Sequence, residues 1–125
     1  MKNKLWNLLD MAAKLAISKE DQRNFIVGCV AIRDDGVLVG AINGPTQFPE
    51  RTAHAEYRAS KKMDYNSTVY VARVRRCDGA LALARPCDDC QKVLIHRKIK
   101  RVYYTVSNDQ YGIWEPGKID VIGSI

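Results

Sequence analysis

Apolar side chains recur at three- and four-residue steps near the start of the chain, between Lys4 and Ile17. They are Leu5, Leu8, Leu9, Ala12, Leu15 and Ala16. This spacing places them on one stripe, so we expect an amphipathic helix with Asn3 available as its N-cap. The next apolar segment, 25–32, is a nearly continuous run that predicts a strand buried on both faces. The helix is expected to pack on this strand.

The dipeptide Asp35-Gly36 separates this strand from a second β-rich segment, 37–42. An Asp-Gly pair between two such segments is a strong hairpin signal, because both residues tolerate the backbone of a tight turn. We therefore expect the sheet to begin with an antiparallel pair. After a loop, residues 53–62 have the Ala, Glu, Arg and Lys content of a helix whose first turn holds His54.

The second half of the chain alternates strand and helix patterns. Residues 68–74 and 101–106 predict strands, and residues 89–97 between them predict a helix. The apolar residues expected on the buried side of this helix are Val93, Leu94 and Ile95. The order strand, helix, strand implies a parallel pair with a right-handed crossover.

A fifth strand is expected around residues 111–114. Only residues 107–110 separate it from the fourth strand, which is enough for a hairpin but too short for a helical crossover. The fifth strand should therefore run antiparallel to the fourth. Residues 75–85 show neither period and are expected to be irregular.

These patterns indicate an α/β protein, and with 46% hydrophobic residues the chain suits one domain over residues 1–125. No apolar run approaches the roughly 20 residues that span a bilayer, and the first ten residues are too polar for a secretory signal. The four cysteines do not form an evenly spaced disulfide framework. We therefore expect a soluble, cytoplasmic protein without a membrane partner.

The formal net charge of +6 gives the chain a mild attraction to phosphate groups. Basic residues gather at 73–76 and again at 97–101. Three interpretations stay open, namely a solvated face, the phosphate of a nucleotide substrate and a nucleic-acid surface. The arginines considered as phosphate contacts are Arg51, Arg73, Arg75 and Arg76.

The pattern with the most chemical content joins His54-Ala-Glu56 to Pro86-Cys87-Asp-Asp-Cys90. One imidazole and two thiolates make three zinc ligands, which leaves the fourth tetrahedral corner open for a water. Cysteines three apart at the start of a helix can both turn toward one ion, and the helix N-terminus favours their thiolate form. Glu56 is then available to carry protons. We predict a catalytic site with one Zn²⁺ per chain.

Either motif alone is a weak signal, because Cys-x-x-Cys also marks structural zinc sites and redox dithiols. A structural site needs a fourth ligand, which Cys77 could supply, and a redox dithiol expects a thioredoxin-like context. Of the other residues that can bind metals, Cys29 is assigned to the core and His96 to the surface.

The two motifs resemble the signature of the cytidine deaminase-like superfamily, and the resemblance extends from the first hairpin through the fourth strand. It implies a three-layer α-β-α sandwich around a five-stranded mixed sheet, with zinc on His54, Cys87 and Cys90. It also implies substrate contacts, for which the counterparts here are Phe25, Asn43, Ala55 and Pro86.

Two of these contacts have alternatives in the residues themselves. The resemblance implies that Asn43 contacts the sugar and that Phe25 lines the base pocket. Asn43 also suits a turn, and Phe25 also suits an ordinary core position.

The activity implied by the resemblance is zinc-dependent hydrolytic deamination of a cytosine nucleoside or nucleotide, with release of ammonia, by a homo-oligomer. The basic surface keeps open a deaminase of bases within RNA or single-stranded DNA, and a third alternative is a zinc-stabilised binding module without catalysis. Two clues to the branch disagree. The short connection 107–110 resembles free cytidine deaminases, whereas histidine as first ligand resembles tRNA adenosine and deoxycytidylate deaminases.

Overall fold

The structure, a computed structural model, describes residues 4–17, 25–33, 35–42, 66–75, 77–86 and 88–124. Within these ranges the helices are α1 (Lys4–Ile17) and α3 (Asp88–His96). The strands are β1 (Phe25–Ile32), β2 (Leu38–Ile42), β3 (Thr68–Arg75), β4 (Leu81–Ala82), β5 (Arg101–Thr105), β6 (Gln110–Trp114) and β7 (Val121–Ser124).

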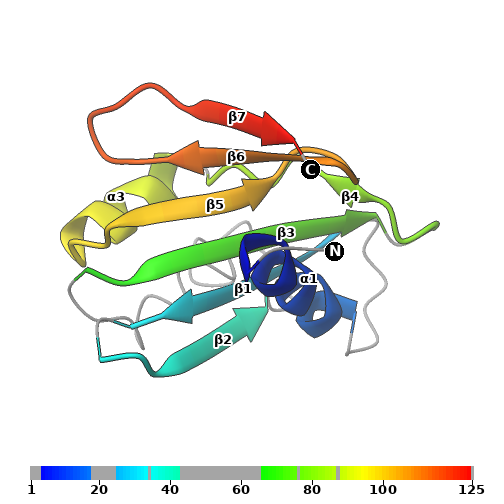
Figure 1. Cartoon of the computed structure of the whole chain (residues 1–125), viewed down its shortest axis with the longest axis horizontal. Helices are drawn as coiled ribbons and strands as arrows, with labels where there is room; N and C mark the ends of the chain where they lie inside the picture. The colour runs from blue at the N-terminus through cyan, green and yellow to red at the C-terminus, as the bar shows by residue number, and fades with distance from the viewer. Residues whose placement is uncertain are drawn as a thin grey trace.

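The seven strands of the described ranges form one mixed sheet with the order β2-β1-β3-β5-β6-β7 (Figure 1). The central strands β3 and β5 are parallel, with Thr68 beside Arg101, and α3 lies between them in the chain. The other neighbouring strands are antiparallel. Strand β4 lies outside this order, because it pairs with Arg73 and Val74 of β3, beyond the part of β3 that pairs with β5.

Helix α1 covers one face of the sheet through small and apolar side chains. Leu9, Ala12 and Ala16 are fully buried and cluster with side chains of β1 and β3. Gly28 in β1 permits a close approach, because a Cβ there would lie only 2.0 Å from the carbonyl oxygen of Ala12. The amphipathic stripe predicted from the sequence is therefore the stripe that packs on the sheet.

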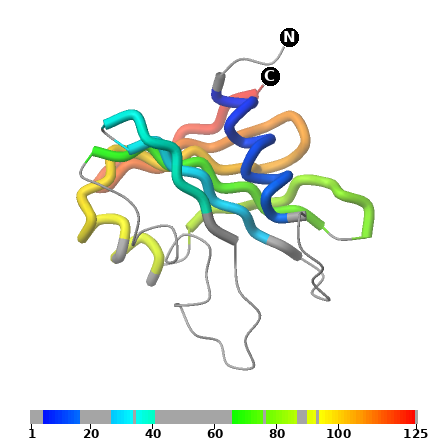
Figure 2. The backbone as a smooth tube through the Cα atoms, turned by 90° about the horizontal axis from the view of Figure 1, so that it is seen from below, coloured from blue at the N-terminus to red at the C-terminus, as the bar shows by residue number. Residues whose placement is uncertain are grey.

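The opposite face of the sheet packs against α3. Leu94 of α3 is fully buried and belongs to a cluster with Val69, Val71 and Val102 of the two central strands. Figure 2 shows α1 and α3 on opposite sides of the sheet. The result is a helix, sheet, helix layering in which the central parallel strands are buried on both faces.

The predicted fold class is confirmed, and the principal elements lie where the periodicity placed them. The first helix has the expected bounds, and β1 and β2 form the expected antiparallel pair. In the connecting turn Gly36 has a φ of 87°, and the Asp35 side chain accepts a hydrogen bond from the Val37 amide at 3.0 Å. The crossover pair is parallel and β6 runs antiparallel to β5, both as predicted.

The number of strands differs from the prediction. Within the described ranges the sheet has seven strands, where five were expected. One of the additional strands, β4, lies inside the segment that was expected to be irregular, and the other, β7, lies after the fifth predicted strand. Strand β4 has two residues and β7 has mostly exposed side chains, so neither produces a periodic pattern.

The buried side of α3 also differs from the prediction. Leu94 is buried, but Ile95 is 48% exposed. Successive side chains of a helix point about 100° apart, so residues 93–95 cannot all face the sheet. The prediction for Ile95 was wrong for this reason.

Other expectations have simpler outcomes. Cys29 is fully buried and His96 is exposed at the end of α3, as predicted. The helix expected over residues 53–62 lies outside the described residues. No helix in the described part of the chain combines the length and the apolar character needed to cross a membrane.

Candidate metal centre

Cys90 is the predicted zinc ligand whose surroundings the structure describes. It lies in the first turn of α3, and its side chain is fully buried. A thiol at the start of a helix is close to the positive end of the helix dipole, which stabilises the thiolate that zinc binds. The donor therefore fits zinc in both its position and its chemistry. Cys87, immediately before α3, lies outside the described residues together with His54 and Glu56.

Pro86, the residue before Cys87, is fully buried and is held by α3. The side chain of Gln91 donates a hydrogen bond from Nε2 to the carbonyl oxygen of Pro86 at 2.8 Å. Gln91 follows Cys90 directly in the helix. The helix that places one predicted ligand thus also fixes the peptide before the other.

Thr105, at the end of β5, holds the chain between β4 and Pro86. Its hydroxyl donates to the carbonyl oxygen of Ala82 at 2.7 Å, and its carbonyl oxygen accepts from the amide of Ala84 at 2.9 Å. The same hydroxyl accepts a hydrogen bond from the Arg73 amide at 3.2 Å. Thr105 is fully buried, and these bonds satisfy its hydroxyl at the point where the pairing partner of β3 changes from β5 to β4.

Arg85 is anchored by Asp120 in the connection between β6 and β7. Its Nε donates to Asp120 Oδ2 at 2.7 Å, and its Nη2 donates to Oδ1 at 3.4 Å. The hydroxyl of Tyr104, on β5, donates to the same Oδ2 at 2.6 Å. The segment 82–86 is therefore attached to β5, to α3 and to the β6–β7 connection before it reaches Cys87.

This network has defined protonation states at neutral pH. The hydrogen bonds from Arg85, with a further bond from Tyr104, hold the pKa of Asp120 below its ordinary value. Burial, reinforced by the hydrogen bond to Asp120, raises the pKa of the Tyr104 hydroxyl to about 12. Asp120 is consequently an anion that accepts, and Tyr104 is a neutral donor.

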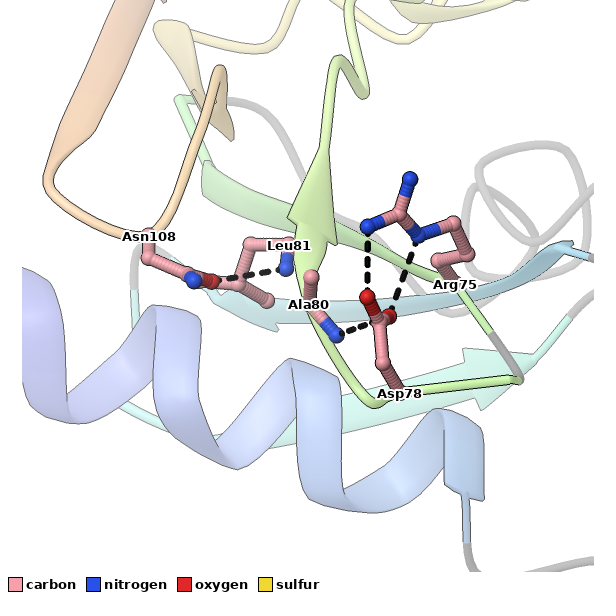
Figure 3. A network of polar contacts seen from close by, with 5 residues as sticks. All are labelled: Arg75, Asp78, Ala80, Leu81 and Asn108. Carbon is pink, nitrogen blue, oxygen red and sulfur yellow. Dashed lines mark hydrogen bonds and ion pairs between the residues drawn. The ribbon is translucent and has the colours of Figure 1, made fainter.

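The arginines considered as phosphate contacts have different surroundings. Arg75 is engaged in the β3–β4 turn, where its Nε donates to Asp78 Oδ1 at 3.0 Å (Figure 3). The hydrogen bond from Arg75 lowers the pKa of Asp78 to about 2, so a phosphate would compete with a charged partner. Arg73 is partly buried on β3, whereas Arg51 and Arg76 lie outside the described residues.

The same turn carries Cys77, the residue that could complete a structural zinc site. Cys77 is exposed, whereas Cys90 is buried. Figures 1 and 2 both show the β3–β4 turn and α3 at opposite ends of the molecule. The structure does not bring these two cysteines together.

The predicted substrate contacts lie largely beyond the described side chains. Phe25 is the first residue of β1, and in the sheet it pairs with Arg75 at the end of β3. Its side chain is outside the described residues, as are Asn43, which follows β2, and Ala55. Pro86 is placed beside the start of α3, as the motif requires.

Sequence reasoning missed three residues that support this segment: Gln91, Thr105 and Asp120. Gln91 lies next to the Cys-x-x-Cys motif and could have been considered as a partner for its backbone. Thr105 and Asp120 are 23 and 35 residues from the groups that they bind, and no local pattern connects them.

Comparisons with known proteins agree with the motifs and with the layering. Residues 2–106 match the sequence model of a family described as the cytidine and deoxycytidylate deaminase zinc-binding region. A comparison with curated protein sequences finds no match.

Among solved structures, a cytidine deaminase from Burkholderia pseudomallei is similar with a TM-score of 0.56 and 14% identity, covering 99% of this chain and 93% of that chain. A cytidine deaminase from Mycobacterium tuberculosis has a TM-score of 0.55 and 20% identity, covering 81% of this chain and 85% of that chain. At these identities the likeness shows a shared fold.

Proposed function

This chain belongs to the cytidine and deoxycytidylate deaminase family, and we propose that it catalyses the zinc-dependent hydrolytic deamination of a cytosine nucleoside or nucleotide. The products are the corresponding uracil compound and ammonia. The observation that carries the proposal is the fully buried Cys90 in the first turn of α3. The segment before the motif, which ends at Pro86, is held by hydrogen bonds with Gln91, Thr105 and Asp120.

We assign the metal to His54, Cys87 and Cys90, with one Zn²⁺ per chain. These are three ligands of the kinds that zinc prefers, and a site with three protein ligands keeps one corner for a water. Bound there, zinc supplies a water whose pKa is lowered toward neutrality.

Glu56 carries the protons in this scheme. Its carboxylate accepts one proton from the attacking water, whose oxygen bonds to C4 of the cytosine ring, and delivers that proton to ring N3. Glu56 then takes the remaining proton from the added oxygen and donates it to the exocyclic amine. The C4–N bond breaks, ammonia leaves, and the added oxygen becomes the carbonyl of the uracil ring.

Substrate positioning is assigned to the residues that the resemblance indicates. We propose that Asn43 contacts the sugar and that Phe25, Ala55 and Pro86 line the base pocket.

For a nucleotide substrate, the phosphate is assigned to arginines of the basic segment 73–76 and to Arg51. Arg51, Arg73 and Arg76 are the candidates, and Arg75 would have to leave Asp78 to take part.

A free nucleoside or nucleotide is favoured over a base within nucleic acid. The antiparallel hairpin of β5 and β6, joined by a short connection, supports this choice, because it is the feature in which the sequence resembles the free cytidine deaminases. The exposed basic residues 97, 98 and 100 follow α3 at the end opposite Cys90.

The test is turnover by the zinc-loaded full chain, followed as ammonia release and loss of cytosine absorbance. The panel contains cytidine, deoxycytidine, their monophosphates and a cytosine-containing oligonucleotide. We expect at least one free substrate to be deaminated. Glu56→Gln should keep its zinc and its fold while the rate falls by about 10²- to 10⁴-fold. Glu115→Gln, a matched change at the ion pairs that Glu115 forms with Arg101 and Lys118, should retain the rate.

The outcomes separate the alternatives. Inactivity of the zinc-loaded protein on every cytosine substrate would refute the substrate assignment. Turnover of the oligonucleotide alone would replace it with a nucleic-acid deaminase. An E56Q variant as active as E115Q would remove Glu56 from the mechanism.

We also propose that the protein is a homo-oligomeric, cytoplasmic enzyme whose catalytic domain extends over residues 1–125. Light scattering coupled to size-exclusion chromatography measures the oligomer, and metal analysis of the same fractions measures the zinc content per chain. A monomer that is fully active would contradict the proposal of an oligomer.

A further inference from the structure

We propose that Asp120 is a positioning residue for the metal centre, acting through Arg85 on the segment that leads into Cys87. The inference rests on the proposed function, since it concerns the assigned zinc ligand Cys87. It goes beyond that function because it gives the connection between β6 and β7, far from the two motifs in sequence, a role in holding the metal.

Arg85 lies close in the chain to the assigned ligand Cys87. It is two residues before Cys87 and directly precedes the buried Pro86. The backbone on either side is already held, because Ala84 donates to Thr105 and Pro86 accepts from Gln91. The side chain of Arg85 adds an attachment to the connection between β6 and β7.

The ion pair itself has the geometry of a specific contact. Two guanidinium nitrogens reach the two carboxylate oxygens at 2.7 and 3.4 Å, and the Arg85 side chain is 44% exposed whereas the Asp120 side chain is 19% exposed. Paired contacts of this kind fix the orientation as well as the distance of the partners. A pair in which both side chains are flexible would hold a segment only weakly, so the strength of this contact depends on how firmly Asp120 is held.

Asp120 is itself anchored to a side chain of the core. Tyr104 is 2% exposed, and its hydroxyl donates to Asp120 at 2.6 Å. The ring of Tyr104 lies over Gly112 of β6, where a Cβ would be only 2.1 Å from the ring carbon Cζ. The carboxylate is therefore attached to a side chain that cannot shift without disturbing the sheet, and it transmits that position to Arg85.

The β3–β4 turn offers a matched control. Arg75 and Asp78 form a similar ion pair, with 50% and 46% of the two side chains exposed. Their turn lies at the opposite end of the molecule from α3 (Figures 1 and 2). Asp78→Asn thus removes the same charge from the same kind of pair without touching the segment before Cys87.

The experiment compares Asp120→Asn, Arg85→Gln and Asp78→Asn in the zinc-loaded full chain, with the rate of zinc release to a colorimetric chelator as the first readout. Loss of a group that directly orients a metal ligand typically changes metal affinity about 10- to 100-fold. Asp120 acts through one more residue, so we expect zinc release to become about three- to tenfold faster in D120N and R85Q. Release from D78N should match the wild type.

Three further readouts separate positioning from general stability. The kcat of D120N should fall while its KM stays at the wild-type value. The double variant D120N/R85Q should release zinc no faster than either single variant, because both changes break the same contact. Hydrogen exchange of a peptide spanning residues 83–87 should accelerate in D120N and R85Q but not in D78N.

The outcomes are distinct from those for the proposed function. If the wild type holds zinc and both D120N and R85Q release it at the wild-type rate, the inference is overturned while the deaminase assignment stands. If the wild type binds no zinc, the proposed function fails and the positioning role falls with it. Should D120N not fold, R85Q carries the same expectation, because it leaves the bond between Tyr104 and Asp120 intact.

Discussion

Replacing Gly28 with alanine tests the packing of α1 on the sheet. A Cβ at this position would lie 2.0 Å from the carbonyl oxygen of Ala12 and 3.1 Å from the amide nitrogen of Ala16. Ordinary contacts of a Cβ begin near 3.4 Å, so the helix and the strand would have to separate by about 1.4 Å. The obstacle is helix backbone, which cannot rotate out of the way as a side chain can.

The size of the effect follows from that geometry. Overpacking a well-filled core typically costs about 1–3 kcal/mol, and a clash with backbone belongs at the upper end. We therefore expect Gly28→Ala to lower the free energy of unfolding by about 3 kcal/mol. At roughly 4 °C per kcal/mol for a chain of this length, the Tm should fall by about 12 °C.

Gly40→Ala is the matched control, because Gly40 also lies in a strand of the same antiparallel pair. There the nearest atom to the added Cβ is the end of the Leu15 side chain at 3.0 Å, which can move aside. The change should alter stability by less than about 1 kcal/mol. Urea and thermal unfolding of the two variants provide the comparison. Equal stability of G28A and G40A would show that α1 does not pack on Gly28 as described.

Three further predictions follow from single residues. Leu94→Ala should lower the free energy of unfolding in urea by about 2–5 kcal/mol, and Ile95→Ala should lower it by less than about 0.5 kcal/mol, because Leu94 is buried and Ile95 is 48% exposed. Similar losses in the two variants would refute the orientation of α3. The pKa of Asp78 is lowered from 3.8 to about 2, so its stabilising contribution is complete above pH 4 and disappears as the pH falls to about 2; that part of the pH dependence of unfolding should be absent in D78N. Ultraviolet titration should show a tyrosine ionising near pH 12 that is missing in Tyr104→Phe, and a variant that instead loses a tyrosine ionising near the ordinary pKa of 10.0 would contradict the burial of this hydroxyl.

Elements with a strong period were predictable from the sequence because their packing repeats along the chain. The stripe of α1 and the apolar run of β1 each bury a continuous surface, so their pattern appears in neighbouring residues. The hairpin was predictable from Asp35-Gly36 because the turn itself selects these residues.

Strands β4 and β7 could not be predicted in the same way. The two residues of β4 are held by contacts from elsewhere, with the Leu81 amide donating to Asn108 at 2.8 Å (Figure 3). Strand β7 pairs with β6 by backbone hydrogen bonds while Val121 and Ile122 remain more than half exposed. Neither strand depends on a hydrophobic pattern, so the spacing of hydrophobic residues does not predict either of them.

The same distinction between local patterns and long-range contacts applies to the candidate site. The Cys-x-x-Cys motif is local, and the prediction that Cys90 begins a helix agrees with its place in the first turn of α3. The anchoring of Arg85 by Asp120 depends on the path of the sheet between them, which sequence spacing does not encode. His54, Glu56 and Cys87 lie outside the described residues, and their roles stay predictions.

The central claim is a zinc ion held by one imidazole and two thiolates with a corner left for water. X-ray absorption at the zinc edge of the purified, substrate-free protein tests it most directly. We predict two Zn–S distances near about 2.3 Å, one Zn–N distance near about 2.0–2.1 Å, and one further light-atom ligand that is retained when Cys77 is replaced with serine. A third sulfur in the coordination shell that disappears in the Cys77→Ser protein would contradict the account, because the corner required for hydrolysis would then be closed.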